Sequence, residues 1–249
     1  MILEMLREQG SVSVEAVRDG FGVSQMTARR DLAILAENGH ARRTHGGAVL
    51  PEVAAHEDSF QSRVVRDSDD KVRLARAVVA ALNPHETIFV DSSTTTYFVV
   101  REVLEVGLPA TILTNSLPVM SLIAARECNI ELIGLAGAFR RLNQSFVGSE
   151  TVRMIQHFYA DRAIFSVKGI ESDGSLTDPD PLEADVKRAM VDRARAVQLA
   201  AESHKFGAHG LNVVVGAESI ESAFLTAHTG RRPAGYSALQ AAGARIISV

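Results

Sequence analysis

The sequence has little cysteine, no long apolar run and no excess of basic residues. Its single cysteine, Cys128, excludes an internal disulfide framework and a zinc site built from several cysteines. No apolar run reaches the roughly 18–20 residues that span a bilayer, and the first residues include acids where a secretory signal has a basic segment. We therefore expect a cytoplasmic protein with no membrane partner and no metal site.

The charge is distributed unevenly along the chain, whose net charge is −4. Residues 1–50 contain six arginines and six acidic residues, so the net charge lies in the remainder of the chain. Four of these arginines form two pairs, Arg29-Arg30 and Arg42-Arg43. DNA binding requires a local basic face rather than a basic protein. The first segment is therefore the candidate for a nucleic-acid surface.

Residues 1–50 show the pattern of three short helices followed by a hairpin. The first helix is expected to end at Gly10, and the second to be capped by Ser13 and broken by Gly20 and Gly22. The third spans residues 24–35 and ends at an Asn-Gly pair. The hairpin is expected to have strands over residues 41–44 and 48–50, joined by a turn at Gly46-Gly47.

The third helix is the candidate recognition helix. Ala28, Leu32 and Leu35 form its inward stripe. Arginine pairs with guanine and glutamine with adenine in the major groove, and a helix N-terminus favours a phosphate. The residues expected to contact DNA are Ser24, Gln25, Thr27, Arg29 and Arg30 on the helix, and Arg42, Arg43 and His45 on the hairpin. The alternative is a small helical domain whose arginine face is merely solvated.

Residues 51–70 are polar and are expected to form a linker that is helical in part, and the rest of the chain is expected to alternate between apolar strands and helices. The expected strands cover residues 87–90, 111–113, 130–135, 162–167, 196–200, 213–215, 223–225 and 245–249. The expected helices cover residues 72–82, 96–104, 119–125 and 183–195. This alternation predicts an α/β domain over residues 71–249, with a mainly parallel sheet covered by helices.

Polar residues follow successive strands of this domain. Residues 91–96, Asp-Ser-Ser-Thr-Thr-Thr, lie between a strand and a helix, where hydroxyls, backbone N–H groups and the helix dipole favour an anion. Residues 114–116, 136–137 and 168–169 follow the next strands, and Lys205 follows a later one. For each of these loops taken alone, a purely structural role explains the residues as well as ligand binding does. Because ligands of open α/β sheets bind at the carboxyl ends of strands, their combination predicts a ligand site.

Two parts of the chain resemble the deoxyribose-operon repressor (DeoR) family. Residues 23–32, VSQMTARRDL, followed by residues 43–48, RTHGGA, resemble its winged-helix signature. The later part resembles its effector domain, which is itself similar to ribose-5-phosphate isomerase. The matching pieces there are residues 91–95, 114–116, Asp161, residues 168–170, Glu183 with Lys187, and Lys205-Phe206. Ser93 departs from the glycine that is frequent in the family, and Glu202 from its aspartate.

The resemblance implies a repressor of a carbohydrate operon. Residues 1–50 are expected to bind double-stranded operator DNA, and residues 71–249 a phosphorylated sugar or polyol. Helix-turn-helix proteins usually read paired half-sites, so a homo-oligomer is expected, with no cofactor. The effector is expected to be bound by Asp91, Ser92, Ser93, Thr94, Thr95, Thr114, Asn115, Ser116, Gly137, Lys168, Gly169, Glu183 and Lys205.

The resemblance also implies individual roles for these residues. The phosphate is expected on residues 92–95 with Lys205 as its cation, and the sugar hydroxyls on Asp91 and Asn115. Arg140-Arg141 lie in a loop that either covers the ligand or is simply solvated. Glu183 and Lys187 are one helical turn apart, so an ordinary ion pair between them explains both equally well.

A sugar-phosphate isomerase with an accessory N-terminal domain is the alternative function. Such an enzyme needs an acid/base carboxylate and a glycine-rich loop around the reaction intermediate. Residues 167–171 contain a single glycine, and Asp161 is all that remains of an acidic cluster. We therefore expect no catalytic residue and no enzymatic activity.

Overall fold

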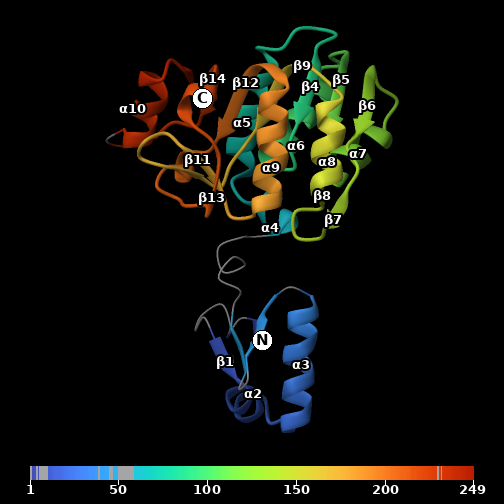
Figure 1. Cartoon of the computed structure of the whole chain (residues 1–249), viewed down its shortest axis with the longest axis vertical. Coiled ribbons are helices and arrows are strands. Elements are labelled where there is room, and N and C mark those ends of the chain that lie inside the picture. Colours follow the sequence, from blue (N-terminus) through green and yellow to red (C-terminus); the bar gives the residue numbers. More distant parts are fainter. Residues whose placement is uncertain are drawn as a thin grey trace. The chain divides into compact units, whose positions relative to one another are not determined.

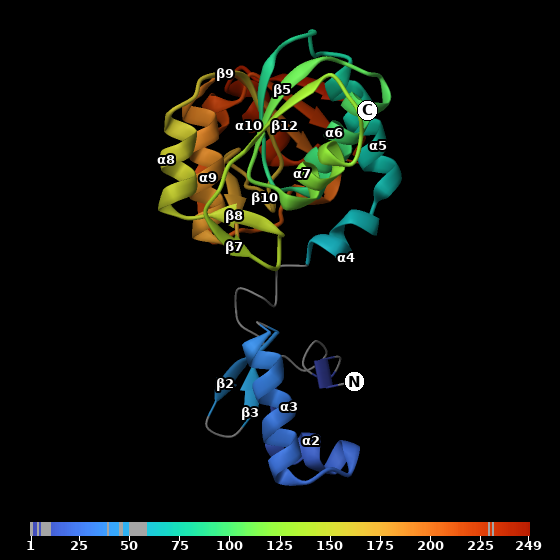
Figure 2. The ribbon, with the colours of Figure 1, turned by 90° about the vertical axis from the view of Figure 1, so that its right-hand side faces the viewer.

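The computed structural model describes residues 2, 3, 5, 11–38, 40–44, 47–49, 59–228, 230 and 232–249, and for residues 11, 37, 42–44 and 47–49 the backbone alone. The chain divides into an N-terminal unit, Met1–Asp58, and a C-terminal unit, Ser59–Val249. Each unit has an apolar core of its own. The helices and strands of the two units are drawn in Figures 1 and 2. No helix in these described ranges has the length and apolar character needed to cross a membrane.

The N-terminal unit contains two well-defined helices, α2 (Val14–Phe21) and α3 (Gln25–Glu37). The hydroxyl of Ser13 accepts a hydrogen bond from the N–H of Ala16, so Ser13 caps α2 as predicted. Gly20 does not break this helix. It ends at Gly22, whose φ of 63° is a left-handed conformation that glycine adopts without strain.

A small antiparallel sheet completes the N-terminal unit. Its strands are β1 (Ser11–Ser13), β2 (Arg42–Thr44) and β3 (Gly47–Val49), in the order β1-β3-β2. Strand β3 begins one residue earlier than expected, because Gly47 pairs with Thr44 inside the ladder. Strand β1 was not expected. Of the expected first helix, residues 2, 3 and 5 are helical, and its end at Gly10 lies outside the described residues.

The C-terminal unit is built on a seven-stranded parallel sheet, which confirms the predicted α/β fold. Its strands are β4 (Thr87–Val90), β5 (Ala110–Thr114), β6 (Ile130–Gly134), β9 (Ala160–Phe165), β12 (Ala194–Ala201), β14 (Ser222–Leu225) and β15 (Arg245–Ser248). Their spatial order is β15-β14-β12-β9-β4-β5-β6. The chain adds strands to one side of β4 and later to the other, so the order reverses between β4 and β9. Such a switch point opens a crevice at the carboxyl ends of the strands.

Helices cover both faces of this sheet. Their bounds are α4 (Phe60–Val65), α5 (Ser68–Val79), α6 (Thr94–Glu105), α7 (Leu117–Ala124), α8 (Ser149–Gln156), α9 (Pro181–Asp192) and α10 (Ala234–Ala241). One face packs against α5, α6 and α7, through residues such as Ile88, Val99 and Phe224. The other face packs against α8, α9 and α10, through residues such as Phe89 and Leu199 (Figures 1 and 2).

Several short elements complete the unit and were not predicted. They are β7 (Ala138–Arg140), β8 (Ser145–Val147), β10 (Gly169–Ile170), β11 (Leu176–Asp178) and the 3-10 helices η2 (Ser203–Lys205) and η3 (Ala217–Ser219). The predicted strand over residues 213–215 exists as β13 (Asn212–Val215), but it pairs with β11 in a separate antiparallel sheet. Helix α5 begins at Ser68, inside the segment expected to be linker.

Candidate functional site

The loop between β4 and α6 holds the predicted hydroxyl groups at the switch point. The Ser93 hydroxyl accepts a hydrogen bond from the N–H of Thr96, so Ser93 is the N-cap of α6. Asp91 fixes this turn, because its Oδ1 accepts hydrogen bonds from the hydroxyls of Ser93 at 2.8 Å and Thr96 at 2.7 Å. Thr94 and Thr95 are buried at the start of the helix. The sequence therefore builds a rigid helix N-terminus lined with hydroxyls, as predicted.

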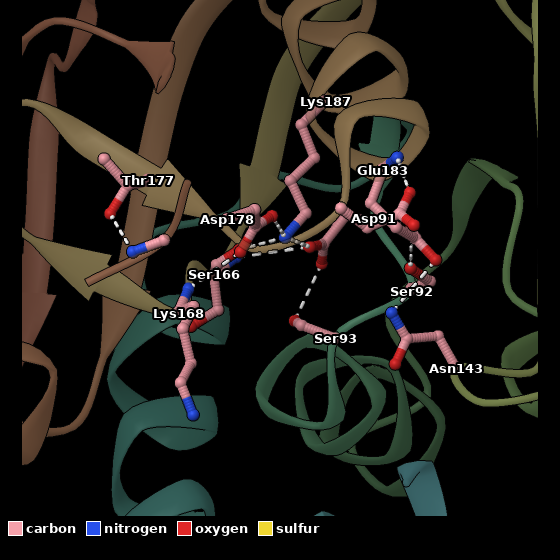
Figure 3. A network of polar contacts seen from close by, with 12 residues as sticks. Asp91, Ser92, Ser93, Asn143, Ser166, Lys168, Thr177, Asp178, Glu183 and Lys187 are labelled. Carbon is pink, nitrogen blue, oxygen red and sulfur yellow. Dashed lines mark hydrogen bonds and ion pairs between the residues drawn. The ribbon is translucent and has the colours of Figure 1, made fainter. Parts of the chain in front are cut away.

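Lys187 on α9 joins this loop to the neighbouring strands (Figure 3). Its Nζ lies 3.2 Å from Oδ2 of Asp91, donates to the carbonyl oxygen of Ser166 at 2.6 Å, and pairs with Asp178. Burial opposes the charge of Lys187, but the carboxylates of Asp178 and Asp91 raise its pKa above the usual value. One buried ammonium group thus holds three chain segments at the crevice.

Glu183, one turn before Lys187, has a different set of partners. Its carboxylate accepts hydrogen bonds from the hydroxyl of Ser92 at 2.9 Å, the amide of Asn143 at 3.0 Å and the hydroxyl of Ser145 at 2.5 Å (Figure 3). Arg140 lies 3.7 Å from the same carboxylate. Glu183 and Lys187 therefore bind separate parts of the site rather than forming the ordinary ion pair that the sequence left open.

Positive charge gathers on the side of the crevice next to Thr95. Lys71 on α5 lies 3.2 Å from the carboxylate of Glu202, which also accepts the hydroxyl of Thr95 at 3.3 Å. Burial opposes the charge of Glu202, but Lys205 and Lys71 hold its pKa below the usual value. Burial, together with the positive charges of Arg63 and Lys168, lowers the pKa of Lys205 to about 8 against the opposing charge of Glu202. The cations here outnumber the carboxylates that face them.

Two buried oxygens and one buried nitrogen of the site have no hydrogen-bond partner among the described residues. They are Oδ1 of Asn115, Oγ of Ser166 and Nε of Arg63. The Asn115 amide nitrogen is already bound to the carbonyl oxygen of Phe146 at 2.9 Å, which fixes the orientation of its side chain. Buried polar atoms are almost always paired, so these three atoms are suited to a polar ligand.

Four of the predicted site residues have structural explanations in this fold. The Thr114 hydroxyl accepts the N–H of Ser116, and Ser116 caps α7. A Cβ on Gly137 would lie 2.0 Å from the hydroxyl of Thr151, and one on Gly169 would lie 1.8 Å from the carbonyl oxygen of Ala208. Close packing thus accounts for both glycines without a ligand.

Asp161, which the resemblance matched to the effector domain, lies near the amino ends of the parallel strands and away from the crevice. Its carboxylate accepts the N–H of Thr87, the first residue of β4, at 2.9 Å. The carboxylates at the crevice include Asp91, Asp178, Glu183 and Glu202 instead.

Sequence reasoning missed several members of the site, chiefly Arg63, Lys71, Asn143, Ser166 and Asp178. A signal existed for Lys71, because it lies on the apolar stripe of α5 with Leu74 and Val78. None existed for Asn143 or Asp178, which lie in loops and short strands without periodicity. Only contacts between segments that are distant in the sequence bring Asn143 and Asp178 to the crevice.

In the N-terminal unit, α3 carries the predicted DNA-contacting residues. The Ser24 hydroxyl accepts the N–H of Thr27 and lies 2.8 Å from the Thr27 hydroxyl, so both groups form the helix cap. Gln25, Arg29 and Arg30 are exposed, while Ala28 and Leu32 are buried. Arg42 and Arg43 lie in β2 as expected, and His45 lies outside the described residues.

Two family models match the chain, one on each unit. Residues 1–53 match the DeoR-like helix-turn-helix domain, and residues 66–225 match the DeoR C terminal sensor domain. The second match spans most of the C-terminal unit, including the crevice at the switch point.

Similar proteins and solved structures fall into two groups. The glycerol-3-phosphate regulon repressor of Escherichia coli (strain K12) is 34% identical over 225 residues, covering 90% of this chain and 88% of that protein. The HTH-type transcriptional regulator IolR of Bacillus subtilis (strain 168) is 32% identical over 82% of this chain and 80% of that protein. The structure of ribose 5-phosphate isomerase A from Methanocaldococcus jannaschii aligns with a TM-score of 0.40 and 14% identity, covering 56% of this chain and 55% of that one. The two domain matches and the extent of the sequence identity show that this chain belongs to the DeoR family of transcriptional regulators.

Proposed function

We propose that the protein is a sequence-specific repressor of a carbohydrate-metabolism operon, controlled by a phosphorylated sugar or polyol. The observation that carries the proposal is the surplus of positive charge beside the buried hydroxyl loop at the switch point. A phosphoryl group is an anion that fits hydroxyls, helix N–H groups and ammonium groups together. The relatives named for a glycerol-3-phosphate regulon make a phosphorylated polyol the first ligand to test.

The phosphoryl group is proposed to bind Ser92, Ser93, Thr94 and Thr95, with Lys168 and Lys205 supplying positive charge. The unpartnered oxygens of Asn115 and Ser166 then accept hydrogen bonds from sugar or polyol hydroxyls. The oxygens of Asp91 already accept the hydroxyls of Ser93 and Thr96 and pair with Lys187. We therefore assign Asp91 to shaping the loop rather than to holding a hydroxyl.

The protein is proposed to act as a homo-oligomer on double-stranded operator DNA. The recognition helix is α3, with Gln25, Arg29 and Arg30 facing bases and phosphates, and the hairpin residues Arg42, Arg43 and His45 contacting the DNA backbone or minor groove. Paired half-sites are the usual targets of helix-turn-helix proteins. Light scattering at micromolar concentration tests the oligomer, and a monomer in the presence of operator would contradict it.

Control by the effector requires a ligand with different affinities for two arrangements of the protein. We propose that α4, the first helix of the C-terminal unit, carries this change. Its Arg63 donates a hydrogen bond to the Asn143 side chain at 2.7 Å, and Asn143 donates to Glu183. The N–H of Phe60, at the start of α4, donates to the carbonyl oxygen of Leu142 at 2.8 Å. A ligand bound in the crevice would thereby act on α4.

The effector site is tested with a thermal-shift screen of sugar and polyol phosphates, followed by titration of each hit. Lys205→Ala and Thr94→Ala should bind operator normally and lose the response to the ligand. Arg195→Ala is the matched control, because its side chain is 82% exposed at the opposite end of the sheet. If both site variants respond with normal affinity, the ligand binds elsewhere.

The DNA-binding role is tested with Arg29→Ala and Arg30→Ala in titrations of the operator. Loss of a base-reading arginine costs about 1–3 kcal/mol and relaxes specificity at one position. Circular dichroism should show that both variants keep their helices, because both side chains are exposed. Unchanged operator affinity in both variants would remove α3 as the recognition helix.

The isomerase alternative is tested directly, and we propose that it fails. The relatives are named as transcriptional regulators. The carboxylates that contact the hydroxyl loop, Asp91, Glu183 and Glu202, are each held by hydrogen bonds or ion pairs, which leaves none of them poised as a free base. A coupled assay with ribose 5-phosphate should show no turnover. Turnover that disappears in Glu183→Gln would establish an enzyme instead.

A further inference from the structure

The outward face of α3 carries an apolar side chain that the expected DNA contacts do not include. Met26 is 80% exposed, and Ile34 on the same helix is 44% exposed. Among the described side chains of the N-terminal unit, these two are the large apolar groups left in solvent. Exposed apolar groups that gather on one surface commonly mark an interaction site.

Helical geometry places Met26 closer to the outward direction than Gln25. Each residue of an α-helix advances by about 100°. The buried residues Ala28 and Leu32 define the inward side of α3. Opposite them lie Met26, Arg30 and Ile34, at intervals of four residues, whereas Gln25 lies nearer the direction of the buried residues. The outward ridge of the helix is thus apolar at its N-terminal end and basic one turn later.

Two other side chains at the start of α3, Ser24 and Thr27, are already engaged. The Ser24 hydroxyl accepts the N–H of Thr27 and pairs with its hydroxyl, so these two side chains face the helix cap. Residues in the first turns of a recognition helix are the ones that meet base edges. Met26 is therefore the side chain of this turn that projects farthest from the core without an assigned role.

The chemistry of Met26 matches one feature of the major groove. Thymine alone among the four bases presents a methyl group there, and apolar side chains contact it. A methionine side chain is flexible and polarizable, so it adapts to such a small apolar target. The neighbouring Arg30 supplies the positive charge that draws the helix to DNA. Protein partners are less favoured, because this arginine lies at the centre of the ridge.

We propose that Met26 is a specificity-determining residue of the recognition helix, and that it reads the C5-methyl group of a thymine in the operator. The inference rests on the proposed DNA-binding function and names one base class within it. It assigns Met26 to direct base reading, whereas Ser24 and Thr27 position the helix.

The experiment replaces each thymine of the operator by deoxyuridine, which removes the C5-methyl group and nothing else. The duplex is one selected from a random-sequence pool by the wild-type protein. We expect one thymine per half-site at which the replacement weakens wild-type binding about four-fold, the affinity equivalent of one buried methyl-sized group. Met26→Ala should bind the thymine and deoxyuridine duplexes equally, and Met26→Leu should retain most of the difference.

Ile34→Ala is the matched control, since it removes an exposed apolar side chain from the same face two turns later. It should keep the sensitivity to the methyl group that Met26→Ala loses. Wild-type binding that is indifferent to every deoxyuridine replacement overturns the inference, and so does a Met26→Ala variant that keeps the difference. Failure of the wild type to select any sequence would instead overturn the proposed function.

Discussion

At the scale of single residues, Lys205 shows most directly how the surroundings of a side chain set its pKa. Burial and the charges of Arg63 and Lys168 lower its pKa to about 8, well below the ordinary 10.5. The ammonium form is therefore lost in the folded protein as the pH rises through about 8. A bound phosphoryl group stabilises the charged form and raises this pKa, so ligand binding near pH 8 takes up a proton.

Ligand affinity should consequently fall as the pH rises through about 8. Calorimetric titrations with a phosphorylated polyol, in two buffers that differ in ionisation enthalpy, measure the proton uptake at pH 8. Lys205→Met should abolish this proton uptake and weaken binding at pH 7. The variant should also gain stability below pH 8, because the folded state resists protonating Lys205 there, and this gain should vanish toward pH 10.5. A pH-independent affinity in the wild type would contradict the assignment of Lys205.

Lys187 provides the second residue-scale prediction, because it neutralises two buried carboxylates. Removing one partner of a buried ion pair leaves an uncompensated charge, which costs about 3–5 kcal/mol. Lys187→Met should lower the free energy of unfolding of the C-terminal unit by that amount, measured in urea at pH 7. The double variant with Asp178→Asn should recover part of the loss. Arg195→Met, an exposed control, should change stability by less than about 0.5 kcal/mol.

Single residues also show which parts of the site could not be predicted from the sequence. The hydroxyls of Ser92, Ser93, Thr94 and Thr95 were predictable, because a polar run directly follows an apolar strand. The partners that fix this loop were not. Asp178 and Asn143 reach it from segments with no periodic pattern. Only the paired strands and helices around them determine that their side chains meet.

At the scale of elements, the strands of the parallel sheet and four helices beside it were predictable, whereas α8, α10 and the shortest strands were not. The strand at residues 87–90 was placed correctly, because Thr87 and three apolar residues end at a polar loop. Strands β10 and β11 have two and three residues, too few to show an alternating pattern. They exist because they pair with each other and with β13. The same reason explains why β13 lies outside the parallel sheet to which its apolar sequence pointed.

Helix α4 gives the prediction at this scale. Asn143 accepts a hydrogen bond from Arg63 of α4 and donates one to Glu183 at the crevice. Asn143→Ala should retain binding of the ligand and of the operator, while the effect of one on the other shrinks by about 0.5–2 kcal/mol. Operator titrations at zero and saturating ligand measure this coupling. Asn83→Ala, an exposed control bound to Glu86, should leave it unchanged. Full coupling in Asn143→Ala would exclude this route through α4.

At the scale of the whole molecule, DNA binding and effector binding are expected to belong to two different units, each with its own core. The core of the N-terminal unit contains Val12, Val17 and Leu32, and that of the C-terminal unit contains residues such as Phe89, Phe165 and Phe224. The charge follows the same division, since residues 1–50 are neutral overall with two arginine pairs and the rest of the chain carries the net negative charge. Net negative charge disfavours contact with DNA, so we expect the N-terminal unit to bind the nucleic acid.

Units with separate cores are expected to unfold in separate transitions. A phosphorylated ligand at about 100 times its dissociation constant should stabilise the C-terminal unit by about 2.7 kcal/mol, and operator DNA should raise the transition of the N-terminal unit. Differential scanning calorimetry with each partner alone distinguishes these effects. Lys205→Ala should cancel the shift caused by the ligand and keep the shift caused by DNA, while Arg30→Ala should do the reverse. If the ligand and the operator both raised one common transition, the two units would unfold as one. The ligand would then stabilise α3 together with the C-terminal unit.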